Sequence, residues 1–510
     1  MRKRTRSFDI NNNNDNNSNT TNSPMTKRRA LSICKPVEVL TLNNATHEFV
    51  ERTVKQRLPS ILKNIIEKNT TEWKKKGKAF FAMTKMRLEE LRQEVDENCY
   101  SGNIEIKYLD DLPENQTWNT DYIREVKGRK LMEVSTFFVE NYFYRRILDA
   151  VLYWDKKIDP FTLHKVEALD SSYVPFKRIF DHISNSESKA KASPKEGTTA
   201  AVENVDIDIT DATKKTIFLN LLHYQLWGNR ADLSLSSGVV ENHININNNN
   251  NNNDDDDDND INVGSGKQAV DPSFVTTTTS TTTKAINKKK EQVSLLVDDS
   301  HSVWDMLMCN SKKQKKIIIV LDNCGLELLS DILCANSLLT NKICDIVELH
   351  CKSTPVFVSD ALGKDIEQTI TWLATKGFES LSTSLRNHLE DNTLIIVDDM
   401  DFYTSPLPYA DMPKALVQRF SDADLVIIKG DANYRRLLGE KKWPMNTAFP
   451  DALSYFYNVN ILALRTLKWP LAVGLNDDMI NRAKTLIGND WDICGRCGTI
   501  QFAQHKRYQR

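Results

Sequence analysis

The stretch Ile317-Ile-Ile-Val-Leu-Asp-Asn-Cys-Gly325 decides the fold class of this chain. Its five aliphatic residues follow one another without polar alternation, which is typical of a strand buried on both faces of a sheet. The sequence that follows predicts a helix over residues 325–340. A buried strand that leads directly into a helix is the repeating unit of a parallel α/β sheet.

Four more short apolar runs repeat this pattern further along the chain. They cover residues 346–350, 394–397, 425–428 and 461–464, and helical stretches separate them. Strands alternating with helices favour one sheet covered on both sides. We therefore predict an α/β fold, a doubly wound, mostly parallel sheet with helices on both faces, over residues 295–510.

The first half of the chain has a different composition. Residues 41–238 show apolar positions at helical spacing and predict an all-α N-terminal domain. Residues 1–40 are basic and rich in Asn, and residues 239–294 hold an Asn run, five consecutive Asp and a Thr run. Such segments cannot bury an apolar core. We predict that both are disordered, and that a Gly/Ser linker could replace most of the insertion with little loss of stability.

The overall composition excludes several classes of protein. Lys+Arg (67) and Asp+Glu (69) nearly balance, so there is no basic excess for nucleic acid. The nine cysteines are scattered, as reduced thiols are, and no apolar run approaches the roughly 18 residues of a membrane span. We expect a cytoplasmic monomer that binds neither nucleic acid nor a membrane. The basic patch Lys27-Arg-Arg29 leaves an additional nuclear location open.

Polar residues follow the predicted strands at the edge where parallel sheets bind ligands. Asp322 and Asn323 end the first run, Asp360 follows the second, and Lys429 and Lys468 follow the fourth and fifth. A helix cap is the alternative interpretation of the first pair taken alone. Together, the three oxygen-bearing side chains suit Mg²⁺ or Mn²⁺ better than zinc, with Co²⁺ or Ni²⁺ also open. The lysines, with Arg435, would supply the positive charge that a phosphate needs.

Several segments give the chain a resemblance to a known family. They are Leu321–Leu328, Lys352–Asp360, Lys429–Leu437 and Leu464–Lys468, with Glu140–Arg146, Leu226–Leu235 and Pro406–Pro413 as weaker matches. In this order they resemble the damage-control phosphatase family, in particular its eukaryotic branch with an Arg-Thr-x-Lys motif, also called acidic residue methyltransferase-like proteins. The resemblance covers residues 45–238 and 295–503. Cys324 and Ala432 depart from the family pattern, but neither is a polar ligand.

The resemblance implies an activity and a set of site residues. The activity is metal-dependent hydrolysis of small phosphorylated metabolites such as fructose 1-phosphate or fructose 6-phosphate. The implied metal ligands are Asp322, Asn323 and Asp360, which also carry the catalysis. The implied substrate contacts are Asp322, Asn323, Asp431, Ala432, Asn433, Tyr434, Arg435 and Lys468. A water activated by the metal is the expected nucleophile, and direct attack by Asp322 is the alternative.

A second enzyme class remains open. The family's other name implies an S-adenosylmethionine-dependent protein-glutamate O-methyltransferase, which would place Glu327 near the methyl donor. Against this, Gly325 stands alone where a Gly-rich turn is usual, and methylation of a carboxylate does not normally need a metal. A non-catalytic binding protein would tolerate loss of the acidic ligands, which are present here. The sequence therefore favours the phosphatase.

Overall fold

The structure is a computed structural model that describes residues 38–41, 53, 56–98, 104–192, 210–229, 295–309, 314–456 and 458–505. These residues belong to one compact unit, Glu38–Arg510. Most of the predicted tail (1–40) and the whole predicted insertion (239–294) lie outside the described residues, so both remain predictions.

Helices account for most of the described chain. They are α2 Leu58–Lys76, α3 Lys78–Asn98, α4 Thr136–Ala150, α5 Tyr153–Lys156, α6 Thr162–Ser171, α7 Tyr173–Ala192, α8 Asp211–Gly228, α10 Ser300–Cys309, α11 Leu326–Thr340, α12 Gly363–Thr375, α13 Glu379–Glu390, α14 Lys414–Ser421, α15 Asp431–Leu438, α16 Phe449–Ala452 and α17 Asp477–Ile487. Single helical turns are η2 Pro113–Asn115, η3 Trp118–Ile123, η4 Leu131–Glu133, η6 Asp401–Thr404 and η7 Tyr409–Asp411.

Seven strands form one sheet in the order β1-β7-β6-β5-β2-β3-β4. They are β1 Leu295–Asp298, β2 Lys316–Val320, β3 Ile346–His350, β4 Leu394–Val397, β5 Leu425–Lys429, β6 Ile461–Thr466 and β7 Gly498–Ala503. Every neighbouring pair is parallel except β6 and β7. The predicted fold class is therefore confirmed, and the five predicted strands correspond to β2 through β6.

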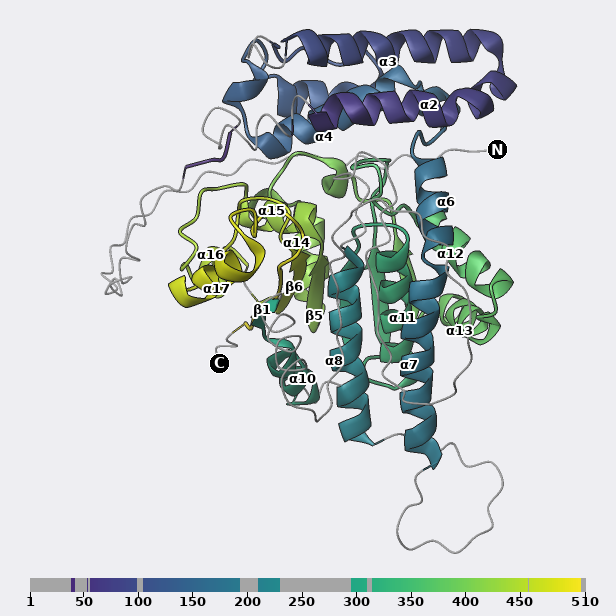
Figure 1. Cartoon of the computed structure of the whole chain (residues 1–510), viewed down its shortest axis with the longest axis vertical. Helices are drawn as coiled ribbons and strands as arrows, with labels where there is room; N and C mark the ends of the chain where they lie inside the picture. Colours follow the sequence, from purple (N-terminus) through teal and green to yellow (C-terminus); the bar gives the residue numbers. More distant parts are fainter. Residues whose placement is uncertain are drawn as a thin grey trace, which may run out of the picture. The chain divides into compact units, whose positions relative to one another are not determined.

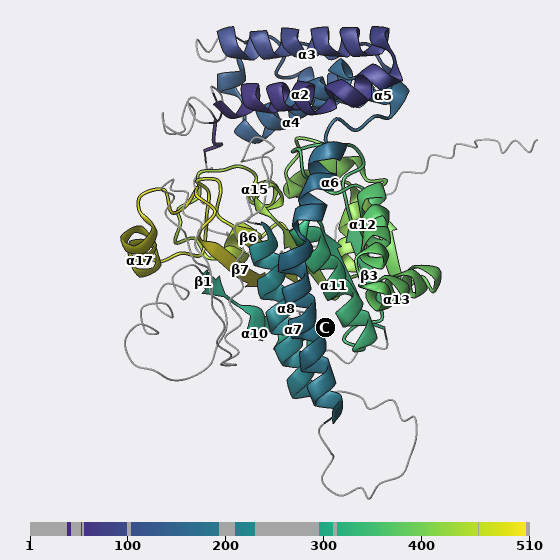
Figure 2. The same ribbon diagram turned by 45° about the vertical axis from the view of Figure 1, so that its right-hand side comes forward.

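Strand β2 shows why a continuous aliphatic run was needed. Ile317 and Ile319 pack on one side of the sheet, against α7, α8 and α11. Ile318 and Val320 pack on the other side, against α14 and α15. Figures 1 and 2 both show α7, α8 and α11 side by side in one helical layer. Both faces are covered, so neither set of positions can be polar.

The N-terminal helices are divided between two cores. Helices α2 to α4 share a core of their own, and both views show them stacked beyond one end of the sheet (Figures 1 and 2). Helices α7 and α8 instead pack on the sheet itself. The name "helical cap" is used below for residues 56–161, which include α2 through α5.

Two boundaries differ from what the sequence predicts. Residues 354–360 predict a helix that opens at Asp360, but α12 begins at Gly363, because Asp360 forms a backbone bridge to Asn323 and cannot also start a helix. The Ser-, Lys-, Ala- and Thr-rich composition of residues 186–204 predicts a loop, but α7 continues to Ala192. The first shift matters for the site, since it frees Asp360 from a capping role.

Strand order reverses beside β2. The chain runs from β2 outward through β3 and β4, then returns to the other side of β2 with β5. Ligands in open α/β sheets bind at such a reversal, beyond the carboxyl ends of the strands. Residues that follow β2 and β5 therefore face one another across the expected binding position.

Candidate active site

A pocket with about 350 Å³ of empty space, including its mouth, opens at this edge of the sheet. Its walls come from the loops after β2, β3, β5 and β6 and from the helical cap. The lining residues are Arg57, Glu140, Asp322, Phe357, Asp360, Asp431, Ala432, Arg435, Lys468 and Trp469. Charged side chains from six separate chain segments thus meet in one small space.

The structure brings the predicted metal ligands together. The Asn323 and Asp360 backbones form an antiparallel bridge, and the Ala361 amide donates to the Asp322 carbonyl over 2.8 Å. Asp322 and Asp360 are 3% and 1% exposed, and both line the pocket. The loops after β2 and β3 are therefore fastened to each other directly at the two carboxylates.

The donor set fits a hard divalent cation. Two buried carboxylates at one pocket offer the oxygen ligands that Mg²⁺ and Mn²⁺ prefer. The Asn323 amide oxygen accepts a hydrogen bond from Ser359 Oγ over 2.5 Å, and an amide oxygen has a second lone pair for a cation. Within the described residues no three His, Cys, Asp or Glu side chains are grouped to hold a metal, so two carboxylates would need further oxygen donors, and the Asn323 amide could be one of them.

One oxygen of Asp322 is held by two amides. Asp322 Oδ2 accepts from Asn323 Nδ2 over 2.8 Å and from Asn229 Nδ2 over 3.0 Å. Both amides also donate to Glu327 Oε2, over 2.9 and 2.8 Å. Gly430 makes room for this arrangement, because a Cβ there would lie 1.8 Å from Asp322 Oδ2. Glu327 is fully buried, and by accepting from both amides it holds them in place.

Lys429 does not line the pocket, contrary to its predicted part in phosphate binding. Its Nζ lies 2.7 Å from Glu327 Oε1 and 3.1 Å from Asp331 Oδ1, and donates to the Gln225 carbonyl over 2.8 Å. Burial would lower the pKa of Lys429, but the charges of Asp331 and Glu327 outweigh it and raise that pKa. Burial raises the pKa of Asp331 to about 7. Lys429 thus neutralises acids beneath the site.

Arg435 lines the pocket but is strongly engaged. It forms a bidentate pair with Glu440, at 2.9 and 3.1 Å, and a further ion pair with Glu140 of the helical cap. Its guanidinium carbon lies 3.5 Å from the centre of the Trp469 ring. Arg57 of the helical cap pairs with the other oxygen of Glu140. These contacts join the helical cap to helix α15 at the pocket wall.

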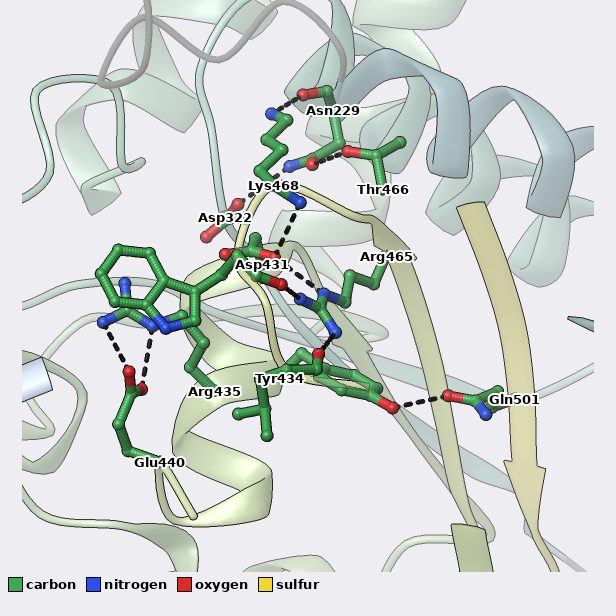
Figure 3. Close-up of polar contacts among 12 residues, drawn as sticks. Asn229, Asp322, Asp431, Tyr434, Arg435, Glu440, Arg465, Thr466, Lys468 and Gln501 are labelled. Carbon is green, nitrogen blue, oxygen red and sulfur yellow. Dashed lines mark hydrogen bonds and ion pairs between the residues drawn. The ribbon is translucent and has the colours of Figure 1, made fainter. Parts of the chain in front are cut away.

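Lys468 and Asp431 also line the pocket, and Figure 3 shows them close to each other. Lys468 Nζ donates to the Asn229 carbonyl, and its backbone amide lies 3.4 Å from Asp431 Oδ1. Arg465 Nε donates to the same Asp431 oxygen over 2.7 Å. Thr466 donates to Asn229 Oδ1 over 2.6 Å. The Arg-Thr-x-Lys segment therefore anchors Asp431 and Asn229 and brings Lys468 to the pocket.

The remaining predicted substrate contacts divide into two groups. Ala432 lines the pocket. Asn433 does not, because its amide donates to the carbonyls of Leu321 and Lys429 over 3.0 and 2.9 Å. Tyr434 also points away, donating to Gln501 Oε1 over 2.8 Å, and burial raises its pKa to about 12. These two residues fasten neighbouring strand ends rather than line the pocket.

Sequence reasoning did not assign several residues that shape the site. They are Arg57, Glu140, Asn229, Phe357 and Trp469. Glu140, Asn229 and Phe357 lie within segments that carried the family resemblance, and Trp469 directly follows Lys468, so these four had a signal. Arg57 precedes α2 without any motif and depends on tertiary packing alone.

Comparison with known proteins gives a consistent match along the chain. A sequence model described as the damage-control phosphatase ARMT1-like domain matches residues 53–265 and 268–481. Damage-control phosphatase ARMT1 of Danio rerio is 27% identical over 498 residues, covering 90% of this chain and 96% of the relative. The Mus musculus and Homo sapiens proteins of the same name are 26% and 25% identical over 485 and 477 residues, each covering 89% of this chain and 96% of the relative.

One solved structure is also similar. It is a DUF89 family protein from Pyrococcus horikoshii, 13% identical, with a TM-score of 0.35 over 84% of this chain and 93% of that one. None of the helices that the structure describes is long and apolar enough to cross a membrane.

Proposed function

This chain belongs to the damage-control phosphatase ARMT1-like family, and on that premise we propose that it is a metal-dependent phosphatase of small phosphorylated metabolites. One observation carries the proposal. The pocket brings the buried carboxylates of Asp322 and Asp360 together with the cation Lys468. The carboxylates can bind a divalent metal and the lysine can bind a phosphate group, so the pocket suits the two together.

The reaction is hydrolysis of a phosphate ester. Water adds to phosphorus, the bond from phosphorus to the ester oxygen breaks, and an alcohol and inorganic phosphate are released. Asp322 and Asp360 would hold the cation, with Asn323 beside them. When bound, a divalent cation supplies charge neutralisation at the phosphate and activation of water. Direct attack by Asp322 stays the alternative route.

The chain's own side chains have separate tasks in this scheme. Lys468 lines the pocket, and its ammonium, a compact positive charge, would bind a phosphate oxygen. Asp431 fixes the backbone of Lys468, and Asn229 fixes both its ammonium and the Asp322 carboxylate. Trp469 covers the apolar part of the substrate and limits access of bulk water.

The nature of the pocket favours a small substrate. Most of its lining side chains are buried and the helical cap contributes to its walls, which suits a small phosphorylated metabolite better than a phosphoprotein. Sugar phosphates of the fructose 1-phosphate or fructose 6-phosphate type are the proposed substrates, in keeping with the family. Mn²⁺ or Mg²⁺ is the proposed metal, and Co²⁺ or Ni²⁺ could replace it.

A metabolite-phosphate screen tests the proposal. Purified full-length protein, stripped of metal, is incubated with each substrate and with Mn²⁺, Mg²⁺, Co²⁺ or Ni²⁺, and phosphate release is measured. We expect release from sugar phosphates that depends on added metal and is abolished by chelation. Metal-independent release, or no release from any small phosphate ester, contradicts the proposal.

The same preparation separates the phosphatase from the methyltransferase. A methyltransferase would transfer a labelled methyl group from S-adenosylmethionine to protein carboxylates, and phosphate analogues would not affect it. We expect no such transfer. Methyl transfer that is lost in Glu327→Ala, together with phosphate release unaffected by Lys468→Met, would overturn the assignment.

We further propose that the protein works as a cytoplasmic monomer. The cysteines within the described residues are free thiols, as is usual in a reducing compartment. Cell fractionation and size-exclusion chromatography with light scattering check the two parts of this proposal separately.

A further inference from the structure

The loop between β3 and α12 contains an unusual backbone segment. Phe357 and Val358 have positive φ angles of 51° and 61°. Residues with side chains rarely adopt this conformation, and a β-branched valine is a genuine outlier there. Such strain persists only where the surrounding structure enforces it, and it clusters at functional sites. The segment ends at Asp360, one of the buried carboxylates that line the pocket.

The helical cap supplies the enforcing contacts. The side chains of Val356, Phe357 and Val358 are at most 5% exposed and belong to the apolar core of the cap. The Phe357 ring centre lies 6.1 Å from that of Phe137 and 5.2 Å from that of Tyr144, both on α4. A loop of the α/β domain thus inserts an aromatic side chain into the core of the other part of the molecule.

Ser359, two residues after Phe357, holds the loop after β2 that carries Asn323 and Cys324. Ser359 donates its backbone amide to the Phe357 carbonyl over 2.6 Å and its hydroxyl to Asn323 Oδ1 over 2.5 Å. Its carbonyl accepts from the Cys324 amide over 2.7 Å. A change in the backbone at Phe357 is therefore passed to Asn323 and Asp360 within three residues.

We propose that Phe357 is a positioning residue through which the helical cap holds Asp360 and Asn323 in their working arrangement. The proposal rests on the proposed function for its catalytic consequence, but its structural part does not. With the ring anchored, the strained segment keeps Ser359 on Asn323 and Asp360 on the pocket wall. Without the anchor, the segment relaxes toward ordinary backbone angles and the contacts of Ser359 are lost.

Hydrogen–deuterium exchange on the full chain tests the structural part. The amides to follow are Ser359, Ala361 and Cys324, whose partners are the carbonyls of Phe357, Asp322 and Ser359. In Phe357→Ala we expect their exchange to accelerate at least tenfold, while Phe357→Leu, which keeps an apolar anchor, restores most of the protection. Hydrogen exchange is measured without substrate and does not depend on catalysis. This result therefore stands even if the protein proves not to be a phosphatase.

Phe143→Ala is the matched control. Phe143 is equally buried in the same core and also packs against Tyr144, but it lies on α4 and not on the loop. It should lower overall stability without opening the three amides selectively. Unchanged exchange in Phe357→Ala, or equal acceleration in Phe143→Ala, overturns the proposal.

Kinetics supply a second readout. Phe357 also lines the pocket. If it acted only as part of the pocket wall, Phe357→Ala would raise KM and leave kcat unchanged. A positioning role predicts that Phe357→Ala lowers kcat at least tenfold with a smaller change in KM, and that Phe357→Leu recovers most of kcat. A change confined to KM, with all three amides still protected, refutes positioning. Phosphate release absent from the wild type would count against the proposed function alone.

Discussion

Asn229, which follows the last residue of α8, donates its side-chain amide to Asp322 Oδ2 over 3.0 Å. The same residue accepts from Thr466 through its side chain and from Lys468 through its carbonyl. Asn229 follows a helix and not a strand, yet it orients both Asp322, a predicted metal ligand, and Lys468, the predicted phosphate-binding cation. Removing this amide should affect catalysis more than stability.

We predict that Asn229→Ala lowers kcat by roughly ten- to a hundredfold. A hydrogen bond to a charged group is typically worth about 1.5–3 kcal/mol, and about 1.4 kcal/mol corresponds to a factor of ten. Asn341→Ala is a suitable control, because that amide bonds to Ser337 at the end of α11, away from the pocket. Steady-state kinetics beside thermal melts of both variants decide the matter. Equal activity in the two variants would show that Asn229 does not position Asp322.

Lys468→Met should lower kcat/KM for a sugar phosphate by roughly ten- to a hundredfold, for the same energetic reason. Lys468 lines the pocket and is 4% exposed, so its contact with a phosphate is shielded from water. Metal binding should be retained, because lysine is not a ligand. Titration with Mn²⁺ and phosphate-release kinetics measure the two effects, with exposed Lys484→Met as the control. Loss of metal affinity in Lys468→Met would contradict the assigned role.

The buried pair of Glu327 and Lys429 predicts a large stability effect. Both side chains are fully buried. Lys429→Met leaves Glu327 and Asp331 without their cation and should cost about 3–5 kcal/mol of unfolding free energy. The double variant Glu327→Gln/Lys429→Met should recover part of that loss. Urea unfolding measures both.

Lys215→Met provides the comparison for an exposed pair. Lys215 lies 3.0 Å from Asp305 at the surface, where such a pair is worth about 0–1 kcal/mol. A loss in Lys429→Met no larger than in Lys215→Met would mean that the buried charges are compensated in another way.

Acid sensitivity should arise in part from Glu348. Burial would raise its pKa, but hydrogen bonds from His350 and Arg419 and the charge of Lys316 outweigh this and lower that pKa to about 2. The stabilisation is therefore complete above the ordinary Glu pKa near 4.5 and is lost as pH falls toward about 2. Each pKa unit corresponds to about 1.4 kcal/mol.

Glu348→Gln should lower the melting temperature at neutral pH and flatten its decline between pH 4.5 and 2. Melting temperatures across this range, with exposed Glu390→Gln for comparison, provide the measurement. An acid limb as steep in Glu348→Gln as in the wild type would assign the acid sensitivity to other groups.

The sequence was sufficient for the fold class because packing on both faces requires aliphatic residues at every position of a central strand. Val426 and Ile428 face one side of the sheet and Leu425 and Ile427 the other. Lys429 continues the second set, which places it under the site with α8 and α11. The alternation of side chains along β5 predicts this buried position of Lys429. Its place at a strand end alone had predicted a position in the pocket.

The site was predictable only where it depends on strand ends. Asp322 and Asp360 follow parallel strands, so topology alone brings them to one edge. Arg57 reaches the pocket because the helical cap packs over that edge, and no local pattern records such packing. Glu140 and Asn229 lie in segments that carried the family resemblance, but their place at the site depends on how the helical cap packs over that edge and how α8 packs against α11.

Phosphate release by Asp322→Ala and Asp360→Ala tests the central claim most directly. Each variant is assayed beside the wild type with a sugar phosphate and saturating Mn²⁺, and bound metal is measured on the same samples. We predict a loss of roughly a hundredfold or more in kcat in each variant, since a metal ion supplies several kcal/mol of transition-state stabilisation and about 1.4 kcal/mol is tenfold. Metal content should fall while the melting temperature stays near that of the metal-free wild type. Wild-type activity and metal content in both variants would place the site elsewhere.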